Sequence, residues 1–383
     1  MGIVNDYFSF QNGYAFKSAD FTENGEYKII KIKELKDGLV KFFDDTAEIN
    51  PSDDFDIEKY IIRKGDVLFA LTGDPVNKPN PLSWVGRVSY YTHDEPALLN
   101  QRVCKAIPKG NVPNEYLFYF FRQESEFYKL ASKATGSASQ ANISTKTIEQ
   151  HRMDIPDKKN MDKIVSTLRD IDKKIENNNQ INRNLSEQLE AIYKEDIKDS
   201  ELPARTVTLD ELCSIFTGRK NANQNDEDGQ YMFFTCGDTP LRINSYIYDG
   251  PAIIISGNGS YTGRTLFYNG KFDLYQRTYA CTLKEGVVPE YIFGLYAILK
   301  IGLHKKISGG THGSSIPYIV MNDLAKFEFD INDDAFMEFS KQSKAILDTV
   351  MHNNTENEQL TKLRDSLLPK LMSGELDVSD LNI

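Results

Sequence analysis

The sequence has few cysteines and few histidines, and these shortages exclude several kinds of site. Its 383 residues include 4 Cys and 5 His. Cys104, Cys213, Cys236 and Cys281 are far apart and form no CxxC pair, which argues against a zinc site and predicts reduced structural thiols rather than disulfides. The histidines are scattered, so their order predicts no Ser-His-Asp arrangement.

Long hydrophobic runs are also missing. No apolar run approaches the roughly 20 residues that a membrane-spanning helix needs. The first residues, Met1–Asp6, lack the basic and apolar regions of a signal peptide. The sequence therefore predicts a cytoplasmic protein.

Catalytic motifs are absent in the same way. Residues 257–263 resemble a glycine-rich phosphate loop, but they lack the GxGxxG spacing and the Gly-Lys-Ser/Thr of a P-loop, so a tight turn between strands is predicted. Residues 80–83 do not match the (D/N)PP(Y/F) loop of an amino-methyltransferase. The carboxylates at 58–59 and 156–158 have no clear spacing for Mg²⁺. We predict no catalytic residue, no metal site and no cofactor in this chain.

The net charge of −11 argues at first against a nucleic-acid partner, but the charge is unevenly distributed. Residues 101–152 carry eight Lys and Arg against four Glu, and residues 264–306 carry seven Lys and Arg against three acids. Two matched basic segments on an acidic protein are typical of a polyanion binder with two sites, although solvated surface charge is the alternative reading.

Two long helices with the same apolar seam organise the chain. Alternating steps of four and three residues predict a coiled-coil helix from Met161 to about Ile197, and a second from about Asp334 to Met372 with Gly374 as its C-cap. The first seam is Ile164, Leu168, Ile171, Ile175, Asn178, Asn182, Leu185, Leu189 and Ile192. The second, 175 residues later, is Phe339, Ser343, Ile346, Val350, Asn353, Asn357, Leu360, Arg364 and Leu367. An asparagine pair therefore interrupts both seams at the same place.

The segment before each helix is duplicated as well. Residues 3–156 read as mixed strand and helix, with strands at 27–32, 67–71, 85–91 and near 153–155, and a helix from about 116 to 130. Matching motifs return in residues 206–331, where Gly218 answers Gly13, Gly263-Arg264 answers Gly86-Arg87, and Gln276-Arg277 answers Gln101-Arg102. The fold class predicted is α+β, with two tandem mixed α/β domains separated by two long antiparallel coiled-coil helices in a pseudo-twofold arrangement. The predicted boundaries are domain 1 at 1–156, central helix at 157–200, domain 2 at 201–331, and C-terminal helix and tail at 332–383.

The recurrent loops supply side chains that can bind base edges and phosphates. Candidates in the first copy are Arg87, Gln101, Arg102, Lys133, Ser137, Ser139, Gln140 and Asn142. Candidates in the second copy are Arg219, Lys220, Asn221, Asn223, Asn258, Arg264, Gln276, Arg277, His312, Ser314 and Ser315. The matched Gln-Arg pairs could instead be scaffold. The unmatched loops are the better candidates for reading sequence, because two copies that read different half-sites must differ there.

Several motifs occur twice in the same order. They are Gly65-Asp66-Val67-Leu68, Gly86-Arg87-Val88 and Asn100-Gln101-Arg102-Val103 with their counterparts, and the loops at Gly136-Ser137 and Gly309-Gly310. A further motif, the terminal stretch from Leu367 to Leu376, occurs once. With the two long helices, these motifs make nearly the whole chain resemble the specificity subunit of type I restriction-modification enzymes. One departure is the start, which lacks residues corresponding to 205–209, so a trimmed or different N-terminus is expected.

The resemblance implies that each domain is a target-recognition domain reading one half of a bipartite double-stranded DNA site. It implies that two modification (methyltransferase) subunits dock on the helices, and that restriction (translocase/nuclease) subunits join them. S-adenosylmethionine, ATP and Mg²⁺ are then expected in those partner subunits, and this chain is expected to be non-catalytic. Asn178, Asn182, Asn353 and Asn357 are predicted to fix the register of the helices. A tandem carbohydrate- or protein-binding scaffold without DNA specificity is the alternative.

Overall fold

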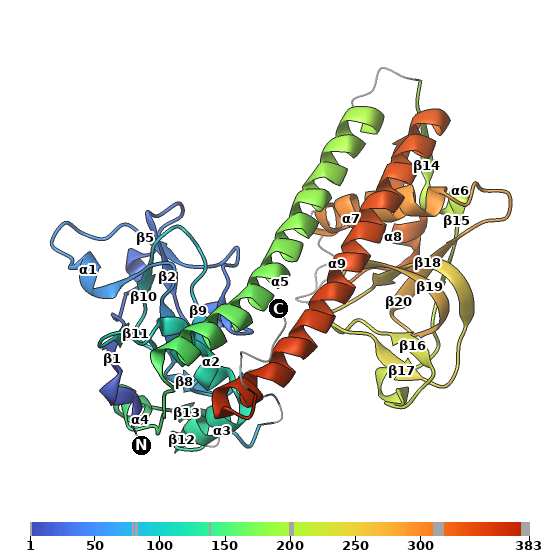
Figure 1. The fold of residues 1–383 in the computed structure, drawn as a ribbon. Helices are drawn as coiled ribbons and strands as arrows, with labels where there is room; N and C mark the ends of the chain where they lie inside the picture. Colours follow the sequence, from blue (N-terminus) through green and yellow to red (C-terminus); the bar gives the residue numbers. More distant parts are fainter. Residues whose placement is uncertain are drawn as a thin grey trace. The chain divides into compact units, whose positions relative to one another are not determined.

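The computed structural model describes residues 2–78, 80, 83–137, 139–198, 203–308 and 318–376 (Figure 1). The chain divides into two compact units, residues 1–175 with 358–383, and residues 176–357. Each unit contains one mixed α/β domain and one half of each long helix. The predicted class, two tandem mixed α/β domains with two long helices, is confirmed; the domain boundaries at 156, 200 and 331 remain a prediction.

The first unit is built on three small sheets. In sheet order, the six-stranded sheet is β1 (Phe8–Asn12), β11 (Val103–Pro108), β7 (Val67–Ala70), β9 (Val88–Tyr90), β4 (Leu39–Val40) and β3 (Leu35–Lys36). A second sheet is β5 (Glu48–Ile49), β2 (Tyr27–Ile30), β10 (Ala97–Leu99) and β6 (Ile61–Ile62), and a third is β12 (Thr135–Ser137), β13 (Gln140–Asn142) and β8 (Thr72–Gly73). The short helices are α1 (Ile57–Tyr60), α2 (Asn114–Arg122), α3 (Glu124–Ala131) and α4 (Thr145–Glu149).

Strand β7 shows why the sequence forms a central strand here. All four of its side chains are buried. Val67 and Phe69 face the cluster that includes α2, whereas Leu68 and Ala70 face a second cluster on the other side. A strand buried on both faces needs a continuous apolar run instead of an alternating one. The buried strand predicted at 67–71 is therefore confirmed.

The second unit repeats this plan with longer strands. Its six-stranded sheet is β15 (Cys213–Thr217), β20 (Thr278–Leu283), β18 (Tyr248–Ser256), β19 (Thr265–Leu274), β16 (Tyr231–Phe234) and β17 (Leu241–Ile243). The remaining elements are β14 (Arg205–Thr208), which pairs with β21 (Glu328–Ile331), and helices α6 (Leu209–Leu212), α7 (Tyr291–Ser308) and α8 (Met321–Ala325). Ile253 and Ile255 of β18 face the α7 side, while Ala252 and Ile254 face the other cluster, so β18 is buried as β7 is.

The long helices are α5 (Lys158–Ile192) and α9 (Asp333–Ser373). The backbone N–H of Asn160 donates to the Asp157 side chain (3.1 Å), which caps the start of α5. Gly374 follows α9 with φ of +74°, and its N–H donates to the carbonyl of Leu371, so the predicted glycine cap is confirmed. None of the eighteen predicted seam residues is exposed, which confirms the coiled-coil pattern. The last predicted turns of the first helix are instead a π-helix, Tyr193–Lys198.

Three local predictions were wrong. The helix predicted from 116 to 130 is broken into α2 and α3, because Gln123 has an extended ψ of 127°. The loop predicted at Gly136-Ser137 is part of strand β12, which pairs with β13. The strand predicted near 153–155 does not form; Arg152 makes only an isolated bridge to Ile3. The equivalent segment of the second unit, β21, is a strand because β14 supplies a full partner.

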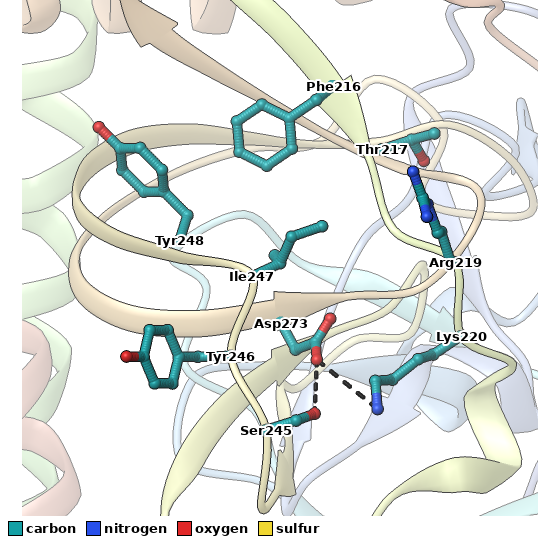
Figure 2. Close-up of a pocket in the computed structure, with 9 residues that line it drawn as sticks. All are labelled: Phe216, Thr217, Arg219, Lys220, Ser245, Tyr246, Ile247, Tyr248 and Asp273. Atoms are coloured by element: carbon teal, nitrogen blue, oxygen red, sulfur yellow. Dashed lines mark hydrogen bonds and ion pairs between the residues drawn. The ribbon is translucent and has the colours of Figure 1, made fainter.

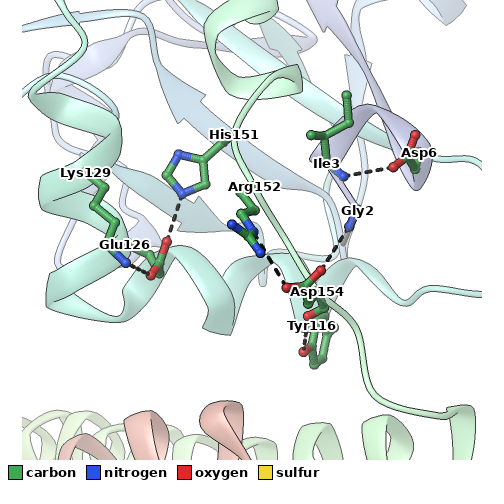
Figure 3. A network of polar contacts seen from close by, with 9 residues as sticks. All are labelled: Gly2, Ile3, Asp6, Tyr116, Glu126, Lys129, His151, Arg152 and Asp154. Atoms are coloured by element: carbon green, nitrogen blue, oxygen red, sulfur yellow. Dashed lines mark hydrogen bonds and ion pairs between the residues drawn. The ribbon is translucent and has the colours of Figure 1, made fainter.

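A polar network ties the segment after α4 to the rest of the first unit (Figure 3). The ring of His151, only 3% exposed, lies against Phe121, and its Nε2 contacts Glu126 of α3 at 2.9 Å. Glu126 also forms an ion pair of 2.6 Å with Lys129. Burial lowers the pKa of His151, and the Glu126 hydrogen bond offsets only part of that effect. His151 is therefore a neutral imidazole that joins α3 to the backbone beside the N-terminal segment.

Candidate nucleic-acid interface

In the first unit, three of the predicted loops meet at the end of β7. The N–H of Ala70 donates to the carbonyl of Arg87 (2.9 Å), and the N–H of Leu71 donates to the carbonyl of Arg102 (2.9 Å). The N–H of Ile143 donates to the carbonyl of Leu71 (3.0 Å). These bonds join the turn before β9, the turn between β10 and β11, and the end of the β12–β13 hairpin. We call this arrangement the first junction.

The second unit contains the same junction at the end of β18. The N–H of Ser256 donates to the carbonyl of Arg264 (3.0 Å), and the N–H of Gly257 donates to the carbonyl of Arg277 (2.9 Å). The N–H of Ile319 donates to the carbonyl of Gly257 (2.8 Å). Every hydrogen bond of the first junction thus has a counterpart in this second junction. The duplication seen in the sequence extends to the backbone bonds that position the candidate side chains.

A glycine makes the turn in front of each matched arginine. Gly86 and Gly263 have φ values of +86° and +83°, a region that L residues rarely adopt. Their N–H groups donate back to Ala70 and Ser256. This turn is the physical reason for the repeated Gly-Arg motif.

The remaining candidates of the first copy surround the first junction. Gln101 and Arg102 are exposed at the β10–β11 turn, and Lys133 is exposed just after α3. Ser137, Ser139 and Gln140 are exposed in the hairpin, where the two serine hydroxyls lie 3.1 Å apart. Asn142 is half-buried, and its Oδ1 accepts a hydrogen bond of 2.7 Å from Thr72. Arg87 is half-buried, and burial lowers its pKa against the opposing effect of Asp74 and Asp37.

In the second copy, Gln276 and Arg277 are likewise exposed. The segment Arg219, Lys220, Asn221 and Asn223 lies beside them, because the N–H of Gln276 donates to the carbonyl of Lys220 (3.0 Å). Asn258 bridges to Tyr318, as Thr72 pairs with Asn142 in the first copy. His312, Ser314 and Ser315 lie outside the described residues.

The guanidinium of Arg264 has several partners within the second unit. It donates to the backbone carbonyls of Gly237 and Asp238, and it lies 3.3 Å from the Asp238 carboxylate. Its ring contact is with Tyr261, 4.9 Å away. In this arrangement Arg264 holds the 237–238 segment, and its contact with DNA remains a prediction.

The structure adds Tyr318, which is 39% exposed, to the candidate surface, and it places the buried Thr72 behind Asn142; the sequence reasoning missed both residues. Both occupy strand positions directly beside a junction. An alignment of the two copies that included the ends of the strands could have found them, because it matches Thr72 with Asn258 and Asn142 with Tyr318.

The four seam asparagines form side-chain hydrogen bonds in the second unit. Asn178 donates to Asn357 (2.9 Å) and to Glu356 (2.7 Å), while Asn353 donates to Asn182 (2.8 Å). These pairs show that α5 and α9 run antiparallel here. Their proposed role in fixing the register remains a prediction.

Within the described residues, no group of three or more His, Cys, Asp or Glu side chains could hold a metal ion. Among those same residues, no helix is both long and apolar enough to cross a membrane.

The fold and its two junctions define a duplicated α/β protein with a pair of long helices and a polar loop cluster in each copy. The family model for the type I restriction modification DNA specificity domain matches residues 3–187 and again residues 203–363. The chain therefore belongs to the family of type I restriction-modification DNA specificity proteins.

Individual relatives agree with this assignment. The type I restriction enzyme EcoDI specificity subunit of Escherichia coli is 36% identical over 177 residues, which is 45% of this chain and 38% of that protein. The type I restriction enzyme MjaIX specificity subunit of Methanocaldococcus jannaschii is 23% identical over 327 residues, covering 75% of this chain and 74% of that protein. The crystal structure of an S subunit of a type I restriction-modification system from M. genitalium matches with a TM-score of 0.60 and 16% identity, over 96% of this chain and 94% of that one. This last match supports the fold.

Proposed function

We propose that this chain is the DNA-recognition subunit of a type I restriction-modification complex, with one half of a bipartite double-stranded site read by each copy. The supporting observation is the recurrence of the junction. The backbone bonds are the same in both copies, whereas the side chains beside them differ, with Asn142 in the first copy where Tyr318 stands in the second. A common scaffold with variable side chains is what the recognition of two different half-sites requires.

The matched and unmatched residues take different roles in this proposal. Arg102 and Arg277 are exposed and hold equivalent places, so they bind the DNA backbone in both half-sites. Asn142, Asn258, Gln140 and the segment at Asn221 lie in places that differ between the copies, so they contact base edges.

The helices supply the other half of the function. In the proposal, the α5–α9 pair sets the length of the non-specific spacer and docks two modification subunits, with restriction subunits joining the complex. Those partners carry S-adenosylmethionine, ATP and Mg²⁺ and perform the methylation and cleavage, and this chain acts in the cytoplasm without a catalytic role.

The test is selection from a randomised duplex pool, with the chain alone and with its modification subunit, at several salt concentrations. We expect enrichment of a split motif with a fixed spacer, and an affinity that falls steeply as salt rises, because phosphate contacts release counterions. Failure to enrich any motif even with the partner present would refute DNA recognition. Salt-insensitive binding to a carbohydrate or protein ligand would support a tandem scaffold instead.

A further inference from the structure

A surface hollow of about 640 Å³ lies beside the second junction (Figure 2). Its lining includes three aromatic side chains (Phe216, Tyr246 and Tyr248), two cations (Arg219 and Lys220) and one acid (Asp273). Asp273 is buried, accepts a hydrogen bond from Ser245 (2.6 Å) and lies 3.8 Å from the Lys220 ammonium. Arg219 is exposed and makes no hydrogen bond or ion pair with any residue that the structure describes. Tyr246 is 49% exposed.

The matching place in the first copy carries a cluster of aromatic rings in place of the cation. Arg219 follows the glycine that succeeds β15, and Tyr14 follows the glycine that succeeds β1. The Tyr14 ring packs against Phe16, Phe55 and Tyr60, with ring centroids 5.1, 5.1 and 5.4 Å away. An exposed cation in the second copy therefore stands where the first copy has a tyrosine, 44% exposed, in an aromatic cluster.

The acid at the base of the hollow is also specific to the second copy. Asp273 is the penultimate residue of β19 and pairs with Phe233 of a parallel strand. The penultimate residue of β10, Leu98, pairs with Ile29 in the same way, and it is fully buried in an apolar cluster. The two copies thus share the strands around this place but differ in its side chains, which are charged in the second copy and aromatic or aliphatic in the first.

We propose that the hollow binds one unpaired nucleotide of the DNA strand contacted by the second copy, an inference that rests on the proposed function. Tyr246 can stack on a base with the part of its ring that Lys271, 4.8 Å from the ring centre, leaves exposed, and Arg219 is a free cation for the phosphate. The Asp273 carboxylate can accept a hydrogen bond from the amino group of adenine, cytosine or guanine. The volume suits one nucleotide, since pockets of about 300–1,000 Å³ hold ligands of that size.

The position of the hollow favours a nucleotide within DNA over a free one. The carbonyl of Lys220 accepts the N–H of Gln276, whose neighbour Arg277 is proposed to bind the DNA backbone. A strand held at Arg277 therefore passes next to Arg219. A free nucleotide has the same chemistry, so the experiment includes deoxyadenosine monophosphate as a separate probe.

The experiment uses the full chain and the duplex recovered from the randomised pool. One unpaired adenine is inserted at each position in turn, and 2-aminopurine replaces it for fluorescence. We expect at least fivefold tighter binding and quenched fluorescence at positions in one half-site only, since a stacked base contributes about 1 kcal/mol or more. Insertions in the other half-site provide the matched control, because the first copy has Tyr14 in place of Arg219 and Leu98 in place of Asp273.

Variants identify the residue responsible. Tyr246→Ala should remove the gain from the unpaired adenine while keeping the affinity for the fully paired duplex, and Tyr246→Phe should retain the gain. A paired duplex that binds specifically, with no gain at any inserted position, would overturn the hollow proposal and leave DNA recognition intact. Binding of deoxyadenosine monophosphate that depends on Arg219, without any gain from an unpaired base, would overturn the assignment to a DNA strand. A pool that yields no motif would overturn both proposals.

Discussion

The side-chain amide of Asn178 donates a hydrogen bond of 2.9 Å to Asn357, and Asn353 donates one of 2.8 Å to Asn182. Asn178 is 1% exposed and Asn353 is 7% exposed. The two pairs follow one antiparallel register, since each step forward along α5 is matched by a step back along α9. Buried amides in an apolar seam favour the one alignment that satisfies them, at a cost in stability.

Replacement of all four asparagines by leucine should therefore raise the melting temperature by several degrees and broaden the spacer length tolerated in the DNA site. Differential scanning calorimetry and selection with spacers of varied length measure the two effects. Asn184→Leu, at an exposed position of α5, is the control and should leave the spacer preference alone. An unchanged spacer preference in the fourfold variant would count against the register role.

A charged cluster in the first unit offers a second prediction. Asp172 accepts hydrogen bonds of 2.7 Å from both Tyr119 and Arg364, and the Arg364 side chain is 9% exposed. Burial and the nearby Asp172 carboxylate raise the pKa of Tyr119, so the phenol stays protonated. Arg364→Ala removes the cation that is hydrogen-bonded to Asp172, leaving only the nearby Arg122, and should destabilise the protein by about 3 kcal/mol in urea unfolding.

In the second copy, apolar residues occupy the positions that match two members of this cluster. The seam position of Arg364 corresponds, 175 residues away, to Leu189, and the position of Asp172 corresponds in the same way to Leu347; both leucines are buried in an apolar cluster. Arg364→Leu combined with Asp172→Leu and Tyr119→Phe should recover part of the stability lost in Arg364→Ala, because apolar side chains then replace the Arg364–Asp172 ion pair, while Arg122 loses its neighbour Asp172 and Asp365 loses its partner Arg364. A triple variant no more stable than Arg364→Ala would show that the loss comes from packing instead of charge.

The buried imidazole of His151 predicts a dependence of stability on pH. Burial, the largest cause, lowers its pKa in the folded protein, so the unfolded chain binds more protons as the pH falls. Stability from this group is fully present above the ordinary imidazole value of about 6.5 and is lost as the pH falls below it. Thermal melts at about pH 7.5 and 5.5 measure the loss. His151→Phe should reduce the difference between the two melts, and an unchanged difference would assign it to other groups.

The matched arginines and the unmatched asparagine predict two different binding defects. Arg102→Ala and Arg277→Ala should weaken binding to all duplexes alike and lower the salt dependence by about one counterion, as expected for phosphate contacts. Asn142→Ala should instead relax the preference at one base pair of one half-site, by about 1–3 kcal/mol. Fluorescence anisotropy over a salt series, with single-base variants of the site, separates the two outcomes. A position-specific loss in Arg102→Ala would reassign that residue to base recognition.

The sequence predicted the parts of the fold that depend on periodicity. The seam spacing located both helices, and the apolar run in β7 located a central strand, because burial imposes these patterns directly. The sequence did not predict the helix break at Gln123, because the surrounding residues favour a helix and only the backbone of Gln123 is extended. The junctions could not be foreseen either. Their hydrogen bonds are made by backbone groups, which every residue type has, so the sequence does not show which groups pair. The carbonyls of Arg102 and Arg277 are examples.

The first unit draws its core from both ends of the chain. Leu368 and Leu371 of α9 are buried in the same cluster as Leu168 of α5 and the apolar side of α2. During synthesis, the first 175 residues leave the ribosome long before these leucines exist. An apolar helix face of the first domain therefore stays uncovered while the second unit is synthesised. The last helix then completes the apolar cores of both units.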